Sequence, residues 1–393
     1  MARSWWSGGA EASAALAAVM RPIEQASGPP NEVYVSEEFA RWEQEFLLAR
    51  SWACIGTGRR VPEPGDARPI AFAGAPLILL RGHDGELRVF HNVCSHRGMK
   101  LIEEPVRIRG TIRCPYHSWT YDPDGSLRAT PMIGGPGKGC VPGFDKSKHG
   151  LKPVRSATWF DAVFVNLSGD AEPFESWIAP LAERWEDFDP AALRFEDRDS
   201  SCELDVACNW KLAVENFCEA YHLPWIHPGL NSYSRLEDHY LIADEDGGYA
   251  GQGTAAYRAQ LVENGDAFPA MPGLPPRWHG KAEYVALFPT ALFGIHADHF
   301  YTVTLQPSGP GRTVERIDIY YFADEALEDR RTGMRQANAA LWRGIFEEDR
   351  SVVEGMQRGR ASPAYRGGVL SPVMEGATHC FYRWFARRLV AAG

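Results

Sequence analysis

The residues best suited to chemistry are two Cys-His pairs separated by 17 residues, Cys94 with His96 and Cys114 with His117. Thiolate and imidazole are common ligands of iron and zinc, so the four side chains predict a metal site. Each pair is mixed, C-x-H and then C-x-x-H. Such pairs favour a [2Fe-2S] cluster in which two thiolates bind one iron and two imidazoles bind the other. The alternative is a structural zinc ion, although zinc sites of this composition usually pair Cys with Cys and His with His along the chain.

A second candidate metal site lies in the segment NWKLAVENFCEAYHLPWIHP, which contains His222 and His227. The segment before His222 is predicted to be helical, and the proline that follows is expected to end that helix. The chain can then turn and bring His227 to the same metal as His222. The alternative for the polar side of this helix, which includes Lys211 and Glu215, is a face exposed to solvent.

Two histidines need a carboxylate to complete the facial triad of non-haem iron oxygenases. The long helical stretch near the C-terminus offers Glu347, Glu348, Asp349 and Glu354. Helical periodicity places Asp349 at the centre of an apolar stripe, with Glu348 at its edge and the other two on the far side. The stripe comprises Trp342, Ile345, Phe346, Val352, Val353 and Met356. A carboxylate buried there is costly unless it is paired or metal-bound, so Asp349 is the candidate ligand, and a buried salt bridge is the alternative.

The elements that would position these residues fall into two patterns. From Trp52 to about Leu167 the sequence predicts a small all-β domain with hairpins that turn at Asp84-Gly85 and Asp124-Gly125. Beyond it, HFYTVTLQPSG and RTVERIDIYYF predict paired strands with one buried face, and a long helix follows them. The segment SEEFARWEQEFLLAR predicts an amphipathic helix near the N-terminus. We therefore expect an α+β chain with an N-terminal helical segment at 1–50, a metal-binding β domain at 51–167 and a second domain at 168–393.

Composition excludes several classes of function. The chain has 393 residues, of which 45% are hydrophobic and 23% charged, and its net charge is −10. The absence of a basic block in the sequence argues against nucleic-acid binding, and no apolar run is long enough to span a membrane. The 8 cysteines are scattered, which favours a reducing compartment and a cytoplasmic location over a disulfide framework. The Ala-rich stretch SAALAAVMRP is interpreted as a first helix, with a degenerate signal peptide as the alternative.

The Cys-His stretch resembles the Rieske motif, C-x-H-(x17)-C-x-x-H, and continues with Ser118-Trp119 as that family often does. From about residue 40 to 388 the chain resembles the α subunit of Rieske non-haem iron oxygenases. The resemblance implies a catalytic domain with a helix-grip (START-like) fold. It also implies two cofactors, a Rieske [2Fe-2S] cluster and a mononuclear Fe(II). The implied cluster ligands are Cys94 and Cys114 on one iron and His96 and His117 on the other, and the implied Fe(II) ligands are His222, His227 and Asp349.

The family also places an acidic residue three positions before the first histidine, where it bridges to a cluster histidine of the neighbouring subunit. Glu219 occupies that position here, whereas many members carry Asp. Asn209 and Trp210 match positions that line the family's active site; helix capping and core packing are the alternatives. The resemblance further implies a head-to-tail homotrimer or multiple of it, and a separate NAD(P)H-dependent reductase, possibly with a ferredoxin. This chain has no G-x-G-x-x-G after a strand and no plant-type ferredoxin cysteine run.

The motif spacing is most similar to the subgroup that acts on choline, carnitine and glycine betaine, which implies N-demethylation or C-hydroxylation. A cationic methylammonium group suits an aromatic cage. The candidates for such a cage are Tyr221, Trp225, Phe288, Phe293 and Phe300, all of which could instead be core residues. Either His296 or His299 could face the cavity, with hydrogen-bonded core histidines as the alternative. The alternative substrate is an aromatic or polycyclic compound, with mono- or cis-dihydroxylation. Two other classes are an electron carrier without oxygenase activity and a zinc-stapled lipid-binding protein.

Overall fold

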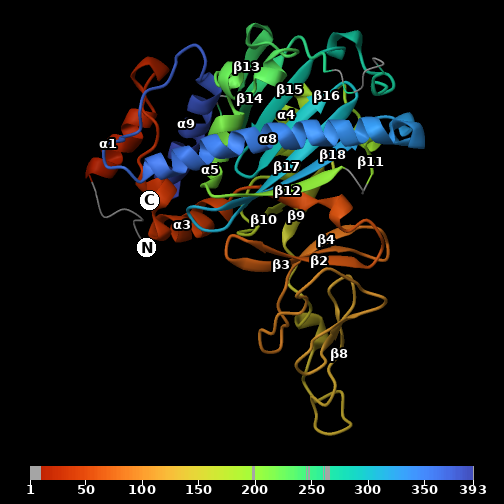
Figure 1. Cartoon of the computed structure of the whole chain (residues 1–393). Helices are drawn as coiled ribbons and strands as arrows, with labels where there is room; N and C mark the ends of the chain where they lie inside the picture. Colours follow the sequence, from red (N-terminus) through yellow and green to blue (C-terminus); the bar gives the residue numbers. More distant parts are fainter. Residues whose placement is uncertain are drawn as a thin grey trace. The chain divides into compact units, whose positions relative to one another are not determined.

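The computed structural model describes residues 10–196, 200–244, 246, 248–259, 261 and 266–392. Residues Ala49–Ala171 form one unit, here called the small unit. The described parts of Met1–Leu48 and Glu172–Gly393 form the other, the large unit (Figure 1). The N-terminal helical segment therefore groups with the C-terminal part of the chain. Residues 1–9 of the segment predicted at 1–50 lie outside the described residues.

The small unit is built from antiparallel strands, as its alternating sequence predicts. Its sheets have the orders β1-β10-β9, β4-β3-β2-β5 and β6-β7-β8. The strand bounds are β1 Ala53–Thr57, β2 Asp66–Phe72, β3 Ala75–Arg81, β4 Leu87–His91, β5 Val106–Arg107, β6 Ile112–Arg113, β7 Thr120–Tyr121, β8 Leu127–Ala129, β9 Arg155–Trp159 and β10 Ala162–Asn166. Both predicted hairpins are present, and their glycines, Gly85 and Gly125, have φ of 86° and 88°. Only glycine adopts such values without strain, which is why the Asp-Gly pairs mark the turns.

The large unit contains an antiparallel sheet with the order β11-β18-β17-β16-β15-β14-β13, and β12 also pairs with β18. The strand bounds are β11 Arg194–Phe195, β12 Ser201–Val206, β13 His239–Ala243, β14 Tyr249–Thr254, β15 Ala282–Leu287, β16 Ala291–His296, β17 His299–Pro307 and β18 Thr313–Tyr321. The predicted strand pair corresponds to β17 and β18, which pair from His299↔Tyr321 to Pro307↔Thr313.

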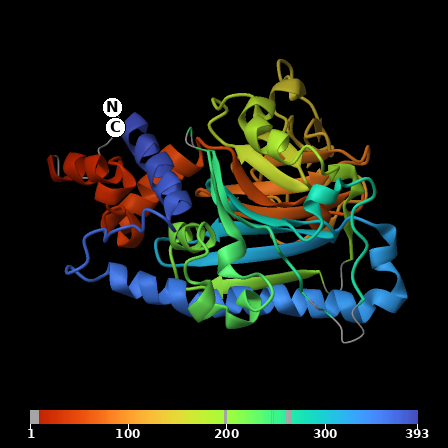
Figure 2. The ribbon, with the colours of Figure 1, turned by 90° about the horizontal axis from the view of Figure 1, so that it is seen from above.

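Helices cover both faces of this sheet. Their bounds are α1 Ala10–Val19, α2 Glu32–Val35, α3 Glu37–Glu43, α4 Phe174–Arg184, α5 Trp210–Phe217, α6 Leu223–Ile226, α7 Pro228–Asn231, α8 Thr332–Arg360 and α9 Gly376–Ala392. Figure 2 shows α8 running along one face, where Trp342 packs on Tyr301 with ring centroids 4.5 Å apart. On the opposite face, Arg184 of α4 binds the Glu283 carboxylate at 2.7 Å. The prediction that β17 and β18 have a single buried face is wrong, because consecutive residues are buried on both strands, including every residue from His299 to Leu305.

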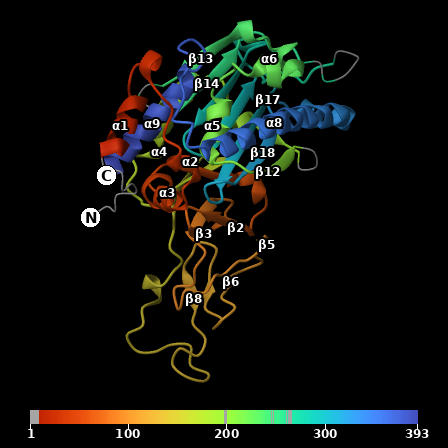
Figure 3. The same ribbon diagram turned by 60° about the vertical axis from the view of Figure 1, so that its left-hand side comes forward.

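The N-terminal helices complete the core of the large unit. Figure 3 shows α1 beside α9, and α2 contacts α8. The helix predicted from SEEFARWEQEFLLAR begins as α3, where the Ser36 hydroxyl caps the N–H of Phe39 at 3.2 Å. From this helix Glu43 reaches Lys211 of α5, with Oε1 2.6 Å from Nζ. Lys211 is 0% exposed and Glu215 is 3% exposed, so this side of α5 is not a solvated face.

The helix that precedes the candidate histidines ends earlier than predicted. Helix α5 stops at Phe217, and residues 218–222 form a turn before α6. Within that turn the N–H groups of Tyr221 and His222 donate to the Glu219 carboxylate rather than to helical carbonyls. Pro224 does not break a helix here. It lies in the first turn of α6, where proline is well tolerated.

The α+β fold class is confirmed, with a small all-β unit and a larger antiparallel sheet gripped by a long helix. Within the described part of the chain, none of the helices combines the length and the apolar character needed to cross a lipid bilayer.

Candidate metal centres

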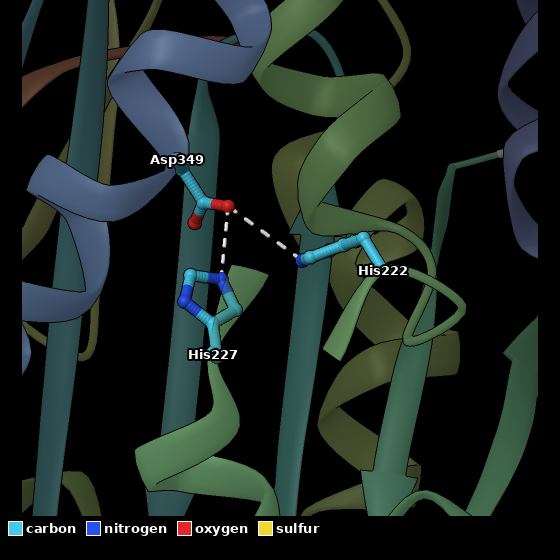
Figure 4. Close-up of side chains that lie close together, drawn as sticks. All are labelled: His222, His227 and Asp349. Carbon is cyan, nitrogen blue, oxygen red and sulfur yellow. Dashed lines mark hydrogen bonds and ion pairs between the residues drawn. The ribbon is translucent and has the colours of Figure 1, made fainter. Parts of the chain in front are cut away.

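His222, His227 and Asp349 lie together in the large unit (Figure 4). One potential ligand atom from each lies within 4.8 Å of the other two. Asp349 Oδ1 is 2.9 Å from His227 Nε2 and 3.6 Å from His222 Nε2. The turn after α5 and the end of α6 supply the histidines, and α8 supplies the carboxylate. Two imidazoles and one carboxylate in this arrangement fit a mononuclear Fe(II) that keeps open coordination positions.

Two further carboxylates orient the imidazoles. His222 Nδ1–H donates to Glu219 Oε1 at 2.6 Å, and His227 Nδ1–H donates to Glu348 Oε2 at 2.6 Å. A proton held on each Nδ1 leaves each Nε2 lone pair for a metal that the Asp349 carboxylate would share, whereas without a metal the 2.9 Å contact of His227 Nε2 with Asp349 needs a proton. Sequence periodicity did not identify Glu348 as part of the site. Its side chain is 51% exposed, and only the fold brings it to His227.

The charge around the histidines is negative. Burial alone would lower the pKa of His227, but its hydrogen bonds and attraction to Asp349 and Glu348 outweigh burial and raise the pKa. Glu219 adds a third carboxylate beside His222. Three anionic groups around two imidazoles favour a bound dication, which would leave a small residual negative charge.

We expect Glu348→Ala to weaken Fe(II) binding about 10–100-fold, the usual effect of losing a group that orients a metal-bound histidine. The change removes the acceptor that fixes the His227 tautomer while all three ligands remain. Fe(II) titration against a competing chelator measures the affinity. Glu347→Ala is the matched control, since this neighbouring carboxylate is exposed and binds Arg350. Equal affinities for the two variants would mean that Glu348 does not orient His227.

A cavity of about 50 Å³ adjoins the triad. Its aromatic lining is Phe217, Tyr284, Tyr301, Trp342 and Phe346. Tyr284 and Tyr301 lie on the same sheet face because both pair with Gly294 between them. A Cβ at Gly294 would lie 2.2 Å from the Tyr301 ring, so glycine is needed for this ring to lie flat over β16.

The aromatic residues predicted for a cage are not among those that line this cavity. Phe293 and Phe300 point to the other sheet face and pack on each other at 5.5 Å, because adjacent strand residues alternate between faces. Phe288 packs against Phe381 and Trp384. Tyr221 and Trp225 are 44% and 70% exposed. The aromatic lining comes instead from one residue each of β15, β17 and α5 and from two residues of α8.

Asn209 is not among the residues that line this cavity, and it has the capping contacts expected for its alternative role. Its side-chain oxygen accepts the N–H of Lys211 at 3.1 Å, and its amide donates to the carbonyls of Tyr34 and Pro310. It is the N-cap of α5. Trp210 is buried and donates from Nε1 to Glu43 at 2.9 Å. Both residues hold α5 in place rather than contact the metal centre.

In the small unit, Cys94 and Cys114 begin two loops with the same hydrogen bonding. The N–H of Cys94 donates to the Met99 carbonyl at 2.8 Å, and the N–H of Cys114 donates to the Trp119 carbonyl at 2.8 Å. Four residues after each cysteine the backbone enters the left-handed region, with φ of 73° at Gly98 in the first loop. The equivalent residue of the second loop has φ of 60°. Two matching tight loops are a suitable frame for a cluster shared between them.

The side chains of these loops fit a two-iron cluster. The His96 and His117 rings lie 4.7 Å apart, and His117 Nδ1 is buried with no hydrogen-bond partner in the described part of the chain, as a ligand atom would be. Both cysteines are buried and unbridged. The Tyr121 hydroxyl lies 3.1 Å from Cys94 Sγ. Among the described residues these four side chains do not close on one point as the triad does, which is unlike a tetrahedral zinc site.

Comparisons with known proteins agree with this geometry. The model of the ring hydroxylating alpha subunit (catalytic domain) matches residues 194–391, and the model of the Rieske [2Fe-2S] domain matches residues 51–144. The carnitine monooxygenase oxygenase subunit of Acinetobacter pittii is 28% identical over 350 residues, which cover 86% of each chain. The chloroplastic choline monooxygenase of Arabidopsis thaliana is 27% identical, over 92% of this chain and 82% of the relative.

A solved structure of a quaternary ammonium Rieske monooxygenase is similar to the whole chain. Its TM-score is 0.78 at 24% identity, with 95% of this chain and 98% of that chain covered. At that identity the likeness concerns the fold. It extends over both units.

Proposed function

Because the chain belongs to the Rieske non-haem iron oxygenases, in the family of ring-hydroxylating α subunits, we propose that it oxidises a small quaternary ammonium or N-methyl compound. The chain is an O2-dependent oxygenase component that receives electrons from a separate reductase. The observation that carries the substrate proposal is the aromatic cavity beside His222, His227 and Asp349.

The proposed ligands follow from the two centres. Cys94, Cys114, His96 and His117 would hold the Rieske cluster, and His222, His227 and Asp349 would hold the mononuclear iron. When bound, the cluster supplies electrons and the mononuclear iron activates O2 beside the substrate. Each turnover then combines O2, two electrons and two protons with the substrate, giving one hydroxylated product and one water. N-demethylation would release that carbon as formaldehyde, whereas C-hydroxylation at another carbon would not.

The cavity supports a cationic substrate. Tyr301, Trp342 and Phe346 present ring surfaces, and neither Lys nor Arg is among the described residues that line the cavity. A trimethylammonium group is attracted to aromatic faces by their quadrupoles. Asp349 and its neighbouring carboxylates add negative potential at the same end. A neutral aromatic substrate would gain nothing from that potential, so the alternative of ring hydroxylation is less well supported. Two relatives that act on quaternary ammonium compounds support the same proposal.

The acidic residue Glu219 is the proposed bridge to a cluster histidine of a neighbouring subunit. It already binds His222 Nδ1, and 14% of its side chain is exposed. Such a bridge requires a head-to-tail arrangement, which closes into a ring, and we propose a trimer. We further propose that the reductase uses NAD(P)H and that the protein is cytoplasmic. We propose a Rieske domain at 51–167 and a catalytic domain at 168–393, to which the N-terminal segment 1–50 contributes.

Electron paramagnetic resonance of the reduced protein with nitric oxide tests this function. We expect a rhombic Rieske signal together with an Fe–NO signal that a trimethylammonium compound reshapes and naphthalene does not. A response to the aromatic compound alone would support ring hydroxylation instead. A Rieske signal without Fe–NO in iron-replete protein would identify an electron carrier.

A further inference from the structure

His296, the last residue of β16, is a buried histidine whose ring nitrogens both lack a hydrogen-bond partner among the described residues. Its exposed fraction is 1%. Its neighbour His299 is different: Trp342 Nε1–H donates to His299 Nε2 at 3.0 Å, and Nδ1–H donates to Asp298 at 2.7 Å. The two imidazoles stack with centroids 4.0 Å apart. His299 therefore has its polar atoms satisfied inside the protein, whereas His296 does not.

Three tyrosine hydroxyls near His296 share this condition. The hydroxyls of Tyr233, Tyr257 and Tyr284 are buried and have no hydrogen-bond partner among the described residues. The Tyr257 ring lies 4.5 Å from His296 and 5.6 Å from Tyr233, and the Tyr284 ring lies 5.6 Å from His296. Buried polar groups are normally hydrogen-bonded, because an unpaired one loses its interaction with water without compensation. Four in one cluster point to a polar ligand atom.

Members of the cluster line two different cavities. Tyr284 lines the cavity of about 50 Å³ at the metal triad. Tyr257 and His296 line a second cavity of about 220 Å³, together with Lys281 and Asp298. The first cavity is large enough for a few water molecules or methyl groups but not for a whole substrate. A substrate with its reactive carbon at the triad must therefore extend beyond the first cavity, and Tyr284 in its lining lies 5.6 Å from His296.

The chemistry of the cluster favours a hydrogen-bond acceptor. Burial raises the pKa values of Tyr257 and Tyr284 well above 10, so these phenols stay protonated donors at neutral pH. Burial also lowers the pKa of His296, so its imidazole is neutral with one N–H to donate. The ammonium of Lys281 is 3.1 Å from the Glu283 carboxylate and is already paired. Several neutral donors converging in a buried site can bind a carboxylate through short charge-assisted hydrogen bonds.

We propose that His296, Tyr257 and Tyr284 form a subsite for a carboxylate at the far end of the substrate from the reacting N-methyl group. This inference rests on the proposed function and narrows it, because a zwitterion with a carboxylate would be preferred over an amino alcohol. Carnitine carries such a carboxylate and choline a hydroxyl, and relatives of both kinds are similar to this chain.

Isothermal titration calorimetry of the iron-loaded protein tests the subsite without turnover. The probes are L-carnitine, its methyl ester and choline, which share the trimethylammonium group. The variants are His296→Phe and Tyr257→Phe, which keep a ring and remove the polar atoms. Thr302→Val is the control, because its hydroxyl is also buried without a partner among the described residues but lies on the opposite sheet face.

We expect the unmodified protein to bind carnitine about 10–100-fold more tightly than the methyl ester, the range for hydrogen bonds to a charged group. His296→Phe and Tyr257→Phe should each lose most of the preference for carnitine, while their affinity for the ester changes little. Thr302→Val should keep the preference for carnitine. If His296→Phe does not fold, Tyr257→Phe alone decides. Equal binding of carnitine and ester, or equal weakening of both by the variants, would overturn the subsite and leave the proposed function intact. Failure of all three probes to bind would overturn both.

Discussion

Asp349→Ala should leave the protein without its mononuclear iron and without O2-dependent turnover, while the Rieske signal persists. Asp349 is the anionic member of the triad, and its Oδ1 lies 2.9 Å from His227 Nε2 and 3.6 Å from His222 Nε2. Its removal leaves two neutral imidazoles, so the loss of Fe(II) affinity should exceed the roughly 100-fold upper range for an outer partner. Iron analysis and the Fe–NO signal measure occupancy, and oxygen consumption with a supplied reductant measures turnover.

Asp205→Ala provides the comparison for this variant. Asp205 is an exposed aspartate of β12 that pairs with Arg312 at 2.7 Å, away from the cavity residues. The Asp205→Ala variant should keep the Rieske cluster, the mononuclear iron and full activity. If Asp349→Ala retained its mononuclear iron and turned over like the unmodified protein, the triad would be misassigned.

Lys211→Met should destabilise the large unit by about 3–5 kcal/mol, because it leaves the buried carboxylate of Glu43 without its partner. Lys211 is fully buried, and its ammonium is 2.6 Å from Glu43 Oε1. The ammonium also lies 4.9 Å from the centre of the Trp210 ring. Burial lowers the pKa of Lys211, which the attraction of Glu43 opposes. Denaturant unfolding followed by tryptophan fluorescence measures the change.

The double variant Lys211→Met with Glu43→Leu tests whether the lost stability comes from leaving one buried charge without its partner. Apolar residues of similar volume remove both buried charges, so the double variant should regain part of the stability lost in Lys211→Met, while the buried Trp210 N–H loses its Glu43 acceptor. Disruption of the exposed Arg312–Asp205 pair should have no measurable effect on unfolding. If the double variant lost as much stability as the Lys211→Met and Glu43→Leu single variants together, the ion pair would not be the cause of either loss.

The candidate ligand residues could be selected from sequence because each depends on short spacing. C-x-H, C-x-x-H and the His222–His227 pair are local patterns, and the periodicity of one helix was enough to select Asp349 from its neighbours. Glu348 could not be predicted in the same way. It lies next to Asp349 in sequence and is half exposed, yet it binds a histidine 121 positions away. Such a partner is defined by the fold rather than by a local pattern.

Dependence on partners that are distant in sequence also explains the predictions that were wrong. The sequence allowed Lys211 and Glu215 to be interpreted as part of a solvent-exposed face. Their partners, Glu43 and Arg360, lie 168 and 145 residues away in sequence. The aromatic cage was assigned to Phe293 and Phe300 by nearness in sequence. A shift of one residue along a strand moves a side chain to the other face, so Gly294 and Tyr301, their neighbours, belong to the cavity side instead.

The division of the chain into a continuous unit and a split unit affects the order in which the two units can fold during synthesis. The small unit is a continuous run, Ala49–Ala171, whereas the large unit is split into Met1–Leu48 and Glu172–Gly393. Domains fold as they leave the ribosome, and a continuous one can do so as soon as its last strand emerges. Glu43 leaves the ribosome before any of the small unit, but Lys211 follows 168 residues later. In each new chain the small unit can therefore fold first. The N-terminal helices remain exposed to solvent until the rest of the large unit has been synthesised.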